Sequence, residues 1–187
     1  MMPANAPSGH YFATDSTTLA SLKSQVVLDN NKLELKINQI SKAPYIVINS
    51  TQNEFKLYSG GQLVREGICS TGSYVKLELN DKQQWVFRTP KGMLKIRNKT
   101  KDPVWKKPDW AFIEEGKAVP SPNHPSRYEY GVLGDYSLAL GDGYLIHGTL
   151  YQRLLGMPVT HGCVRLGDQD LEAVFRTLRI GDRVYIY

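Results

Sequence analysis

The chain has 187 residues, of which 41% are hydrophobic and 22% charged, and its formal net charge is +5. This length and composition are typical of a globular protein with one domain and a sizeable core. No stretch approaches the roughly 18 consecutive apolar residues of a membrane-spanning helix, and no nucleic-acid-binding motif accompanies the modest basic excess. These features argue against a nucleic-acid partner and leave only an unseen anchor as a route to a membrane.

We interpret residues 1–43 as an N-terminal extension. Residues 1–15 are rich in proline, alanine, glycine and serine, which predicts a disordered start. From residue 16 to 42, apolar residues recur at the spacing of one helical face, at Leu19, Leu22, Val26, Leu33, Ile37 and Ile40. This spacing predicts a helix that either packs onto the rest of the chain or acts as a spacer.

From residue 44 onward the sequence consists of short β-type runs broken by turns. Strands are predicted at residues 45–48, 54–58, 63–71, 85–87, 93–96, 144–146 and 183–187. The glycines of Ser59-Gly60-Gly61 predict a hairpin turn between the second and third runs. One helix is predicted over residues 169–178, with Asp168 as its N-cap. The predicted fold is mainly β with one or two helices.

Residues 97–143 are predicted to be a long loop insertion in this domain. The segment contains several prolines and glycines and has weak hydrophobic periodicity. Loops of this length in compact domains are often binding loops or lids. Its aromatic and basic stretch 103–112 contains Trp105, which either forms a platform for a saccharide or peptide or packs the loop onto the domain.

The chain has two cysteines, Cys69 and Cys163, which is too few for a disulfide framework. Cys69 lies in an apolar stretch and is interpreted as a small buried strand residue. A bridge between the two would block the thiol chemistry that the surroundings of Cys163 suggest.

Those surroundings are Thr160-His161-Gly162-Cys163-Val164-Arg165, preceded by Ile146-His147-Gly148-Thr149. A thiol nucleophile needs a base or a positive field, and two histidines lie close to this cysteine in sequence. The glycine before it permits a sharp turn that exposes the sulfur and directs backbone N–H groups at an oxyanion. Two other interpretations are a buried structural cysteine, which would explain the residue types but not their occurrence together with the further motifs given below, and a metal site. His161-Gly162-Cys163 is tight spacing for two tetrahedral ligands, and we expect no metal and no cofactor.

This pair of motifs resembles the catalytic signature of the YkuD-type L,D-transpeptidases. Ser70-Thr71-Gly72, Thr89-Pro90-Lys91-Gly92 and Gly181-Asp182-Arg183-Val184 follow the family pattern in the same order. The resemblance covers residues 44–187. It implies a YkuD-like β-sandwich or barrel of mixed sheets and cysteine acyl transfer on peptidoglycan stem peptides.

Within this resemblance, Cys163 is the nucleophile and His147 the general base and acid, with the Gly148 carbonyl orienting the imidazole. His161 tunes the thiol or supports the loop, and the N–H groups of Gly162 and Cys163 are the oxyanion donors. Arg165 supplies a positive field, binds a substrate carboxylate or forms a structural salt bridge. The remaining predicted substrate-binding residues are Gly148, Thr149, Thr160, Tyr128, Tyr130 and Trp105.

The implied reaction is release of a terminal D-alanine from the donor stem, followed by transfer to an amine of an acceptor stem. The alternatives are an L,D-carboxypeptidase that uses water and a wall-binding module without turnover. Carbapenems are the implied inhibitors. A peptidoglycan substrate implies a periplasmic or cell-envelope location, although residues 1–7 lack the basic and apolar regions of a signal peptide.

Overall fold

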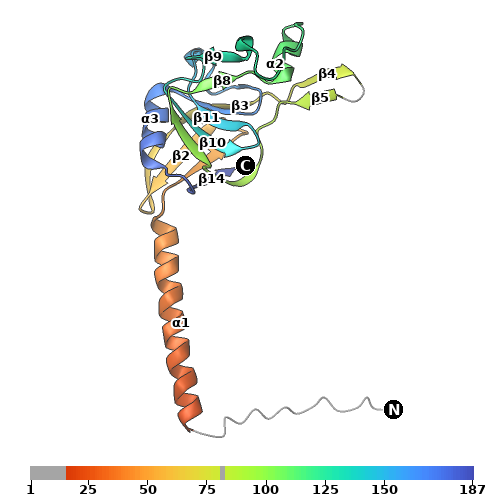
Figure 1. Ribbon diagram of the computed structural model, residues 1–187. Helices are drawn as coiled ribbons and strands as arrows, with labels where there is room; N and C mark the ends of the chain where they lie inside the picture. Colours follow the sequence, from red (N-terminus) through yellow and green to blue (C-terminus); the bar gives the residue numbers. More distant parts are fainter. Residues whose placement is uncertain (1–15, 81–82) are drawn as a thin grey trace, which may run out of the picture. The chain divides into compact units, whose positions relative to one another are not determined.

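The computed structural model describes residues 16–80 and 83–187, and it divides into a unit that ends at Ser41 and a second unit, Lys42–Tyr187. The predicted disordered start, residues 1–15, lies outside the described residues. The first unit contains helix α1, Ser16–Lys42, where the sequence predicts a helix (Figure 1). Leu22 and Leu33 are more than half exposed on this helix. None of the helices described has the length and apolar character needed to cross a membrane.

The second unit contains one ten-stranded sheet (Figure 1). Its strands are β1 (Tyr45–Asn49), β2 (Glu54–Ser59), β3 (Gln62–Gly72), β6 (Gly92–Lys95), β7 (Asn98–Lys101), β10 (Tyr136–Gly141), β11 (Tyr144–His147), β12 (Pro158–Thr160), β13 (Val164–Leu166) and β14 (Arg183–Ile186). They are ordered β6-β14-β1-β2-β3-β13-β11-β10-β7, and β12 also pairs with β3.

The sheet is mixed, because β1–β14, β11–β13 and β3–β12 are parallel and the other pairs are antiparallel. Strand β3 joins its two halves, since its first part pairs with β2 and its last residues pair with β13 and β12. The sheet curls into a half-barrel. The prediction of a mainly β fold built on a mixed sheet is confirmed.

The core follows from strand periodicity. Ile46, Ile48, Phe55 and Leu57 alternate with polar or partly exposed residues along β1 and β2, and none of the four is more than 1% exposed. Helix α3, Asp168–Thr177, packs Leu171 and Val174 into the same core. The helix N-cap is Gly167, with no side-chain capping bond, so the prediction of Asp168 as the cap is wrong. Asp168 lies in the first turn, where its charge suits the helix dipole.

The long loop predicted at residues 97–143 contains regular structure. Strands β7 and β10 belong to the main sheet and pair with each other, while β8 (Val104–Lys106) and β9 (Tyr128–Tyr130) form a small separate sheet. A short helix α2, Asp109–Glu114, and a 3-10 turn, Pro125–Arg127, lie between them. Helix α2 adds one helix to the two that the sequence predicts. Strands of three residues and a six-residue helix are too short to give a periodic pattern among prolines.

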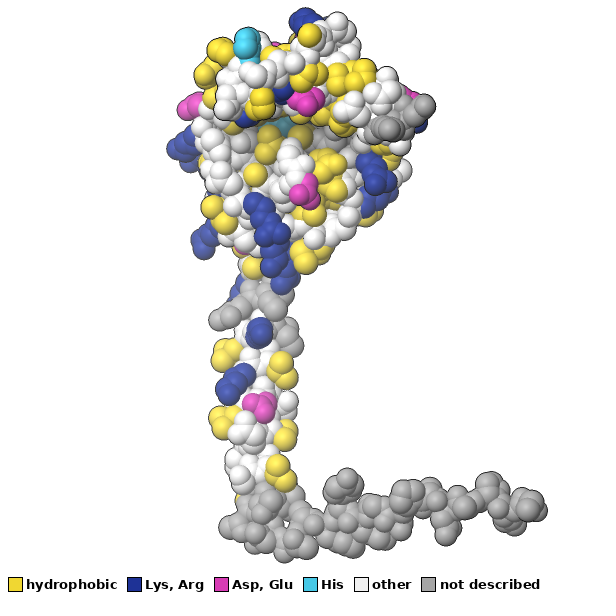
Figure 2. Space-filling model, turned by 45° about the vertical axis from the view of Figure 1, so that its right-hand side comes forward, with side chains coloured by type: hydrophobic (Ala, Val, Ile, Leu, Met, Phe, Trp, Pro, Cys, Tyr) yellow, Lys and Arg dark blue, Asp and Glu magenta, His cyan; other side chains and the backbone are white. Residues whose placement is uncertain are grey.

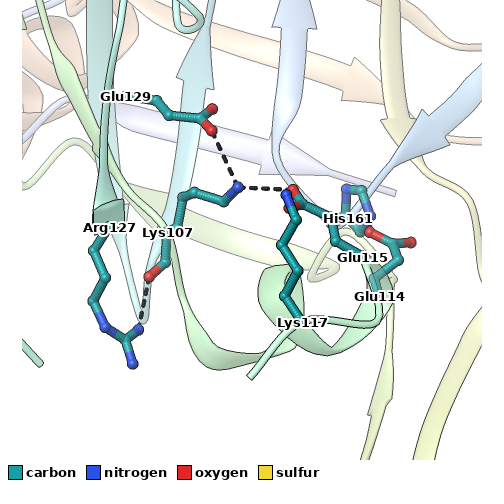
Figure 3. A network of polar contacts seen from close by, with 7 residues as sticks. All are labelled: Lys107, Glu114, Glu115, Lys117, Arg127, Glu129 and His161. Carbon is teal, nitrogen blue, oxygen red and sulfur yellow. Dashed lines mark hydrogen bonds and ion pairs between the residues drawn. The ribbon is translucent and has the colours of Figure 1, made fainter. Parts of the chain in front are cut away.

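We call residues 103–130 the cap segment. Two buried cations hold it together (Figure 3). Lys107 Nζ is 2.7 Å from Glu115 and 3.1 Å from Glu129. Arg127 donates to the Lys107 carbonyl at 3.0 Å and to the Asp109 carboxylate at 2.7 Å. These bonds join α2 to the β8–β9 sheet, so the cap segment is an ordered body rather than a loop.

The two strands not yet described, β4 (Lys76–Asn80) and β5 (Gln83–Val86), form a separate hairpin that extends from the end of β3 (Figure 1).

Candidate active site

The predicted nucleophile, Cys163, lies in a tight turn between β12 and β13. Gly162 in this turn has φ +119°, and a Cβ there would lie 2.8 Å from the Tyr144 ring and 2.9 Å from the Arg88 carbonyl oxygen. A side chain at this position is therefore excluded both by conformation and by space. Tyr144 was not predicted as a site residue.

Thr160 closes this turn. Its hydroxyl accepts the Gly162 N–H at 3.0 Å and donates to the Cys163 carbonyl at 2.6 Å. The side chain is only 2% exposed, so Thr160 shapes the turn instead of lining a substrate surface. The Gly162 N–H is therefore engaged within the turn in the resting structure, and its role as an oxyanion donor stays a prediction. The Cys163 N–H has no acceptor among the described residues and is the remaining backbone donor of the turn.

The Cys163 thiol is partly buried next to β11. Its Sγ accepts the Leu145 N–H at 3.4 Å and lies 3.8 Å from the Gly143 carbonyl oxygen. Burial raises the pKa of the thiol, while the Leu145 amide and the Arg165 charge oppose that rise. The resting group at neutral pH is thus a thiol. No hydrogen bond joins Sγ to an imidazole anywhere in residues 16–80 and 83–187.

The second cysteine has no part in the site. Cys69 is fully buried on β3, as predicted, and burial followed by the charge of Glu54 raises its pKa to about 12. Both cysteines are free.

His147 ends β11, the strand beside Cys163, and its register partner on β13 is Arg165. The imidazole is 5% exposed, and its Nδ1 is the one buried side-chain nitrogen or oxygen of the described residues that lacks a hydrogen-bond partner. Burial, followed by the Arg165 charge, lowers the pKa of His147 to about 4, while the Gly148 carbonyl opposes this effect without reaching hydrogen-bond geometry. At pH 7 the ring is therefore neutral and able to accept a proton. Unpaired buried polar atoms are rare and often functional.

Gly148 and Thr149 hold the chain that follows this histidine. The Gly148 N–H donates to the Leu133 carbonyl at 2.7 Å, and a Cβ on Gly148 would lie 3.0 Å from Gly134 Cα. The buried Thr149 hydroxyl accepts the Tyr151 N–H at 3.0 Å. Both predicted substrate-binding residues are engaged within the fold.

His161 faces α2 of the cap segment. Its Nε2 lies 2.8 Å from a Glu114 carboxylate oxygen (Figure 3). Its ring stacks on Trp110, with centroids 4.3 Å apart, and meets the Phe87 ring edge-on at 4.4 Å. These contacts favour the prediction that His161 supports the loop. No sequence pattern indicated Glu114 or Phe87. Among the described residues, no three or more His, Cys, Asp or Glu side chains are grouped to hold a metal ion.

Arg165 is half-buried and has no carboxylate partner in the part of the chain that is described. Burial lowers the pKa of its guanidinium, and the neighbouring Cys163 and Tyr151 oppose this effect. Of its three predicted roles, the structural salt bridge is absent from the described residues.

The aromatic residues predicted from the insertion lie in the cap segment. Trp105 packs near Trp110, with centroids 6.2 Å apart, which extends the cluster around His161. Tyr128 and Tyr130 are exposed on β9, and Lys106 lies over the Tyr128 ring. No hydrogen bond or ring contact joins either tyrosine to the Cys163 turn within the described residues. Figure 2 shows a hollow in the surface of the Lys42–Tyr187 unit, below the uppermost part of that unit in this view. Hydrophobic side chains lie along the hollow, and a histidine side chain is visible inside it.

Comparison with known proteins agrees with this fold and motif order. The family model of the YkuD L,D-transpeptidase catalytic domain matches residues 43–186. "Probable L,D-transpeptidase YbiS" of Escherichia coli K12 is 27% identical over 192 residues, covering 98% of this chain and 54% of the relative. The chain thus spans about half the length of this relative.

Solved structures share the architecture. The L,D-transpeptidase of Xylanimonas cellulosilytica has a TM-score of 0.55 at 18% identity, covering 79% of this chain and 61% of its own. L,D-transpeptidase 3 of Mycobacterium tuberculosis, solved with a faropenem-derived adduct, has a TM-score of 0.55 at 20% identity, covering 77% of this chain and 60% of its own. At these identities the solved structures establish the fold. The family model covers most of the chain, which therefore belongs to the family of YkuD L,D-transpeptidase catalytic domains.

Proposed function

We propose that this protein is a cysteine acyltransferase that acts on peptidoglycan stem peptides, with Cys163 as nucleophile and His147 as general base and acid. Membership of the L,D-transpeptidase family supports the reaction class. The observation that carries the assignment of residues is the neutral, unpaired imidazole of His147 on the strand adjacent to the Cys163 turn.

In the acylation step, Sγ attacks the carbonyl carbon of the L-centre of the diamino acid in a tetrapeptide stem. The thiol proton passes to His147, and the carbonyl oxygen becomes an oxyanion that the Cys163 N–H stabilises. Collapse of this intermediate breaks the amide bond. The imidazolium returns its proton to the departing amine, D-alanine leaves, and a thioester remains.

In the second step an amine of an acceptor stem attacks the thioester. His147 accepts a proton from that amine and returns it to the departing sulfur, which restores the thiol and forms a new amide. Attack by water would instead release a trimmed stem, as in an L,D-carboxypeptidase. Transpeptidation is the leading outcome because the family is named for it.

The resting electrostatics favour proton transfer during attack over a preformed ion pair. The Cys163 pKa is raised and the His147 pKa lies well below 7, so both groups are neutral in the free enzyme. The proposed mechanism requires Cys163 Sγ and the His147 imidazole to come within hydrogen-bond distance once substrate binds. Such catalytic hydrogen bonds are often long or poorly aligned in free enzymes. Arg165, which has no ion-pair partner among the described residues, supplies positive charge for the developing thiolate and a partner for a donor carboxylate.

Mass spectrometry of muropeptides after incubation with the purified chain tests this proposal. We expect crosslinked dimers and free D-alanine from the wild type, and neither from Cys163→Ala. The matched control is Cys69→Ala, which removes the other thiol and retains the products. Trimmed stems without dimers would establish the hydrolytic alternative. Products from Cys163→Ala would refute the thiol mechanism, and no products from well-folded wild type would favour the wall-binding alternative.

The same thiol is proposed to react with β-lactams. One structural neighbour is solved in complex with the carbapenem imipenem and another with a faropenem-derived adduct, which supports a β-lactam adduct on Cys163 of this chain. Intact mass after incubation with a carbapenem should increase by the mass of the drug, and Cys163→Ala should stay unmodified. A peptidoglycan substrate would place the protein in the periplasm or cell envelope.

A further inference from the structure

One row of side chains crosses the outer face of the sheet at the start of β1 and β14. In register, Lys95 of β6 pairs with Arg183 of β14, which in turn pairs with Tyr45 of β1. Tyr45 also pairs with Tyr58 of β2. Val184, the residue after Arg183, is fully buried in the core, so the row points to the opposite side, toward solvent. We call these four residues the basic–aromatic row.

The two cations of this row face each other without a counter-charge. Like charges directly opposite each other on neighbouring strands destabilise a sheet. Lys95 and Arg183 are such a pair, and within residues 16–80 and 83–187 neither forms an ion pair with a carboxylate. Asp182, the carboxylate next to Arg183 in sequence, accepts the Arg179 N–H at 2.7 Å. A pair that costs stability and has no partner in the described part of the fold suits an anion supplied from outside.

The neighbouring charges leave this part of the face positive. On the next outward row, Lys56 lies 3.8 Å from Glu66, so that pair is neutral. Glu54 lies at the far end of β2, about 13 Å from the basic–aromatic row. Lys42 adds a further exposed cation beside the β2–β3 turn, where its carbonyl accepts the Gly60 N–H at 3.1 Å.

Three tyrosines form the uncharged part of the same face. The Tyr45 and Tyr58 rings are stacked with centroids 4.8 Å apart, and the Tyr185 ring meets the Tyr45 ring edge-on at 5.8 Å. All three side chains are partly exposed, and their hydroxyls have no hydrogen-bond partner within the described residues. Met93, the register partner of Tyr185, is 52% exposed. The face thus combines cations, tyrosine rings and an exposed apolar side chain.

We infer that this face binds the surface of an anionic lipid bilayer. Phosphate headgroups supply the counter-charge for Lys95 and Arg183. Tyrosine rings suit the boundary between water and hydrocarbon, and Met93 contacts the apolar side of that boundary. A soluble polyanion would neutralise the cations but would leave the apolar side chain in water. A second copy of this chain would bring the same cations together, which charge repulsion disfavours.

Docking through this face leaves the Cys163 turn free. Strand β3 connects the two regions, because Leu63 near its start pairs with Tyr58 and Gly72 at its end pairs with Thr160. Leu63 and Gly72 are nine positions apart, which at about 3.3 Å per residue is roughly 30 Å along the strand. The inference concerns where the chain resides and does not depend on the reaction proposed for Cys163.

Flotation of the whole chain with lipid vesicles tests this surface. The wild type should bind vesicles made of equal parts phosphatidylglycerol and phosphatidylcholine, and this binding should weaken as salt is added. It should bind vesicles of phosphatidylcholine alone far less. Lys95→Gln and Arg183→Gln should each lower the partition coefficient for the anionic vesicles about fivefold, and the double variant about 25-fold. Arg183→Lys, which retains the charge, should bind as the wild type does.

Arg153→Gln is the matched control, because it removes one exposed positive charge from the 3-10 turn between β11 and β12, outside this face. It should change the partition coefficient by less than about twofold. Lys95→Gln relieves the repulsion between opposed cations, so its Tm should equal or exceed that of the wild type. Equal losses of binding for Arg153→Gln and Lys95→Gln would reduce the effect to net charge, and a lower Tm for Lys95→Gln would assign this side chain a structural role. Either result would overturn the inference.

Met93 distinguishes a bilayer from a soluble anionic polymer. Met93→Ser should weaken binding to the anionic vesicles about two- to fivefold and leave binding to soluble polyphosphate unchanged. Vesicle binding that does not respond to Met93→Ser, together with equally tight binding of polyphosphate, would identify a polymer as the occupant and refute the bilayer surface.

Vesicle binding and the proposed reaction can fail separately. Cys163→Ala removes the proposed nucleophile and should bind anionic vesicles as the wild type does. A wild-type chain that releases D-alanine but does not float with anionic vesicles would refute the surface and leave the reaction standing. Flotation of a chain that releases no D-alanine would support the surface and count against the reaction alone.

Discussion

The protonation states of Cys163 and His147, the proposed nucleophile and base, give a prediction that pH can test. The pKa of the Cys163 thiol is raised above its ordinary value of 9.0, while the pKa of His147 is lowered to about 4. At pH 6 an imidazole with a pKa of about 4 is only about 1% protonated, compared with about 76% for an ordinary histidine. The free enzyme therefore contains a neutral pair.

Alkylation of the thiol by iodoacetamide measures the thiolate directly. In a Cys69→Ala background, we expect the rate of Cys163 alkylation to increase about tenfold per pH unit from pH 6 to 9 without a plateau. Release of D-alanine from a stem peptide should be nearly constant over the same range, because neutral His147 removes the proton during attack. Its acidic limb should fall near pH 4.

The two pH profiles can be followed by intact mass and by a D-alanine assay on the same preparation. Alkylation that is already constant between pH 6 and 7 would reveal a preformed thiolate–imidazolium pair and refute the reasoning. An acidic limb near pH 6.5 would show that the base is an exposed histidine rather than the buried His147.

Three further changes have defined outcomes. The pKa of His147 is lower in the folded chain than its ordinary value of 6.5, so the unfolded chain binds more protons between about pH 6.5 and 4, and the free energy of unfolding falls as pH falls through this range. Urea unfolding should therefore give about 2 kcal/mol less stability at pH 5 than at pH 7, and His147→Asn should remove this difference. Gly148→Ala places a Cβ within 3.1 Å of two backbone atoms and should cost about 1–3 kcal/mol in the same assay, whereas an unchanged midpoint would mean that the neighbouring loop gives way freely. Glu114→Ala removes the hydrogen-bond partner of His161 and should slow acylation by a β-lactam about two- to tenfold with little change in Tm. The control Glu115→Ala loosens the cap segment but leaves that partner in place, and it should slow acylation less. Equal effects of the two substitutions would argue against a role for the Glu114 contact.

The sequence predicted β1, β2, β3, β6, β11 and β14 of the main sheet because hydrophobic patterning is a local property, whereas β7, β10, β12 and β13 were not predicted. In residues 45–48 and 54–58 every second side chain is buried, and the apolar residues at these positions predict one face of each strand in the core. The Cys163 motif was equally visible, since its residues are consecutive.

What the sequence did not predict depends on contacts between distant segments. The partner of His161 is Glu114, 47 positions earlier and on a helix too short to be periodic. The occupied Gly162 N–H follows from the rotamer of Thr160. The raised pKa of Cys163 follows from burial against β11, which a linear motif does not report.

The cap segment enters and leaves the fold at one place. Strands β7 and β10 flank it and pair with each other, and the Asp102 N–H donates to the Asp135 carbonyl at 2.9 Å. The two ends of the segment therefore lie side by side. A segment whose two ends lie side by side can be replaced by one of different length without a change in the pairing register of β7 and β10. Because helix α2 also carries Glu114 and Trp110, which contact His161, each exchange would change the support of the turn that contains Cys163. A change in this segment is thus expected to act on the proposed active site through His161 while the main sheet stays as it is.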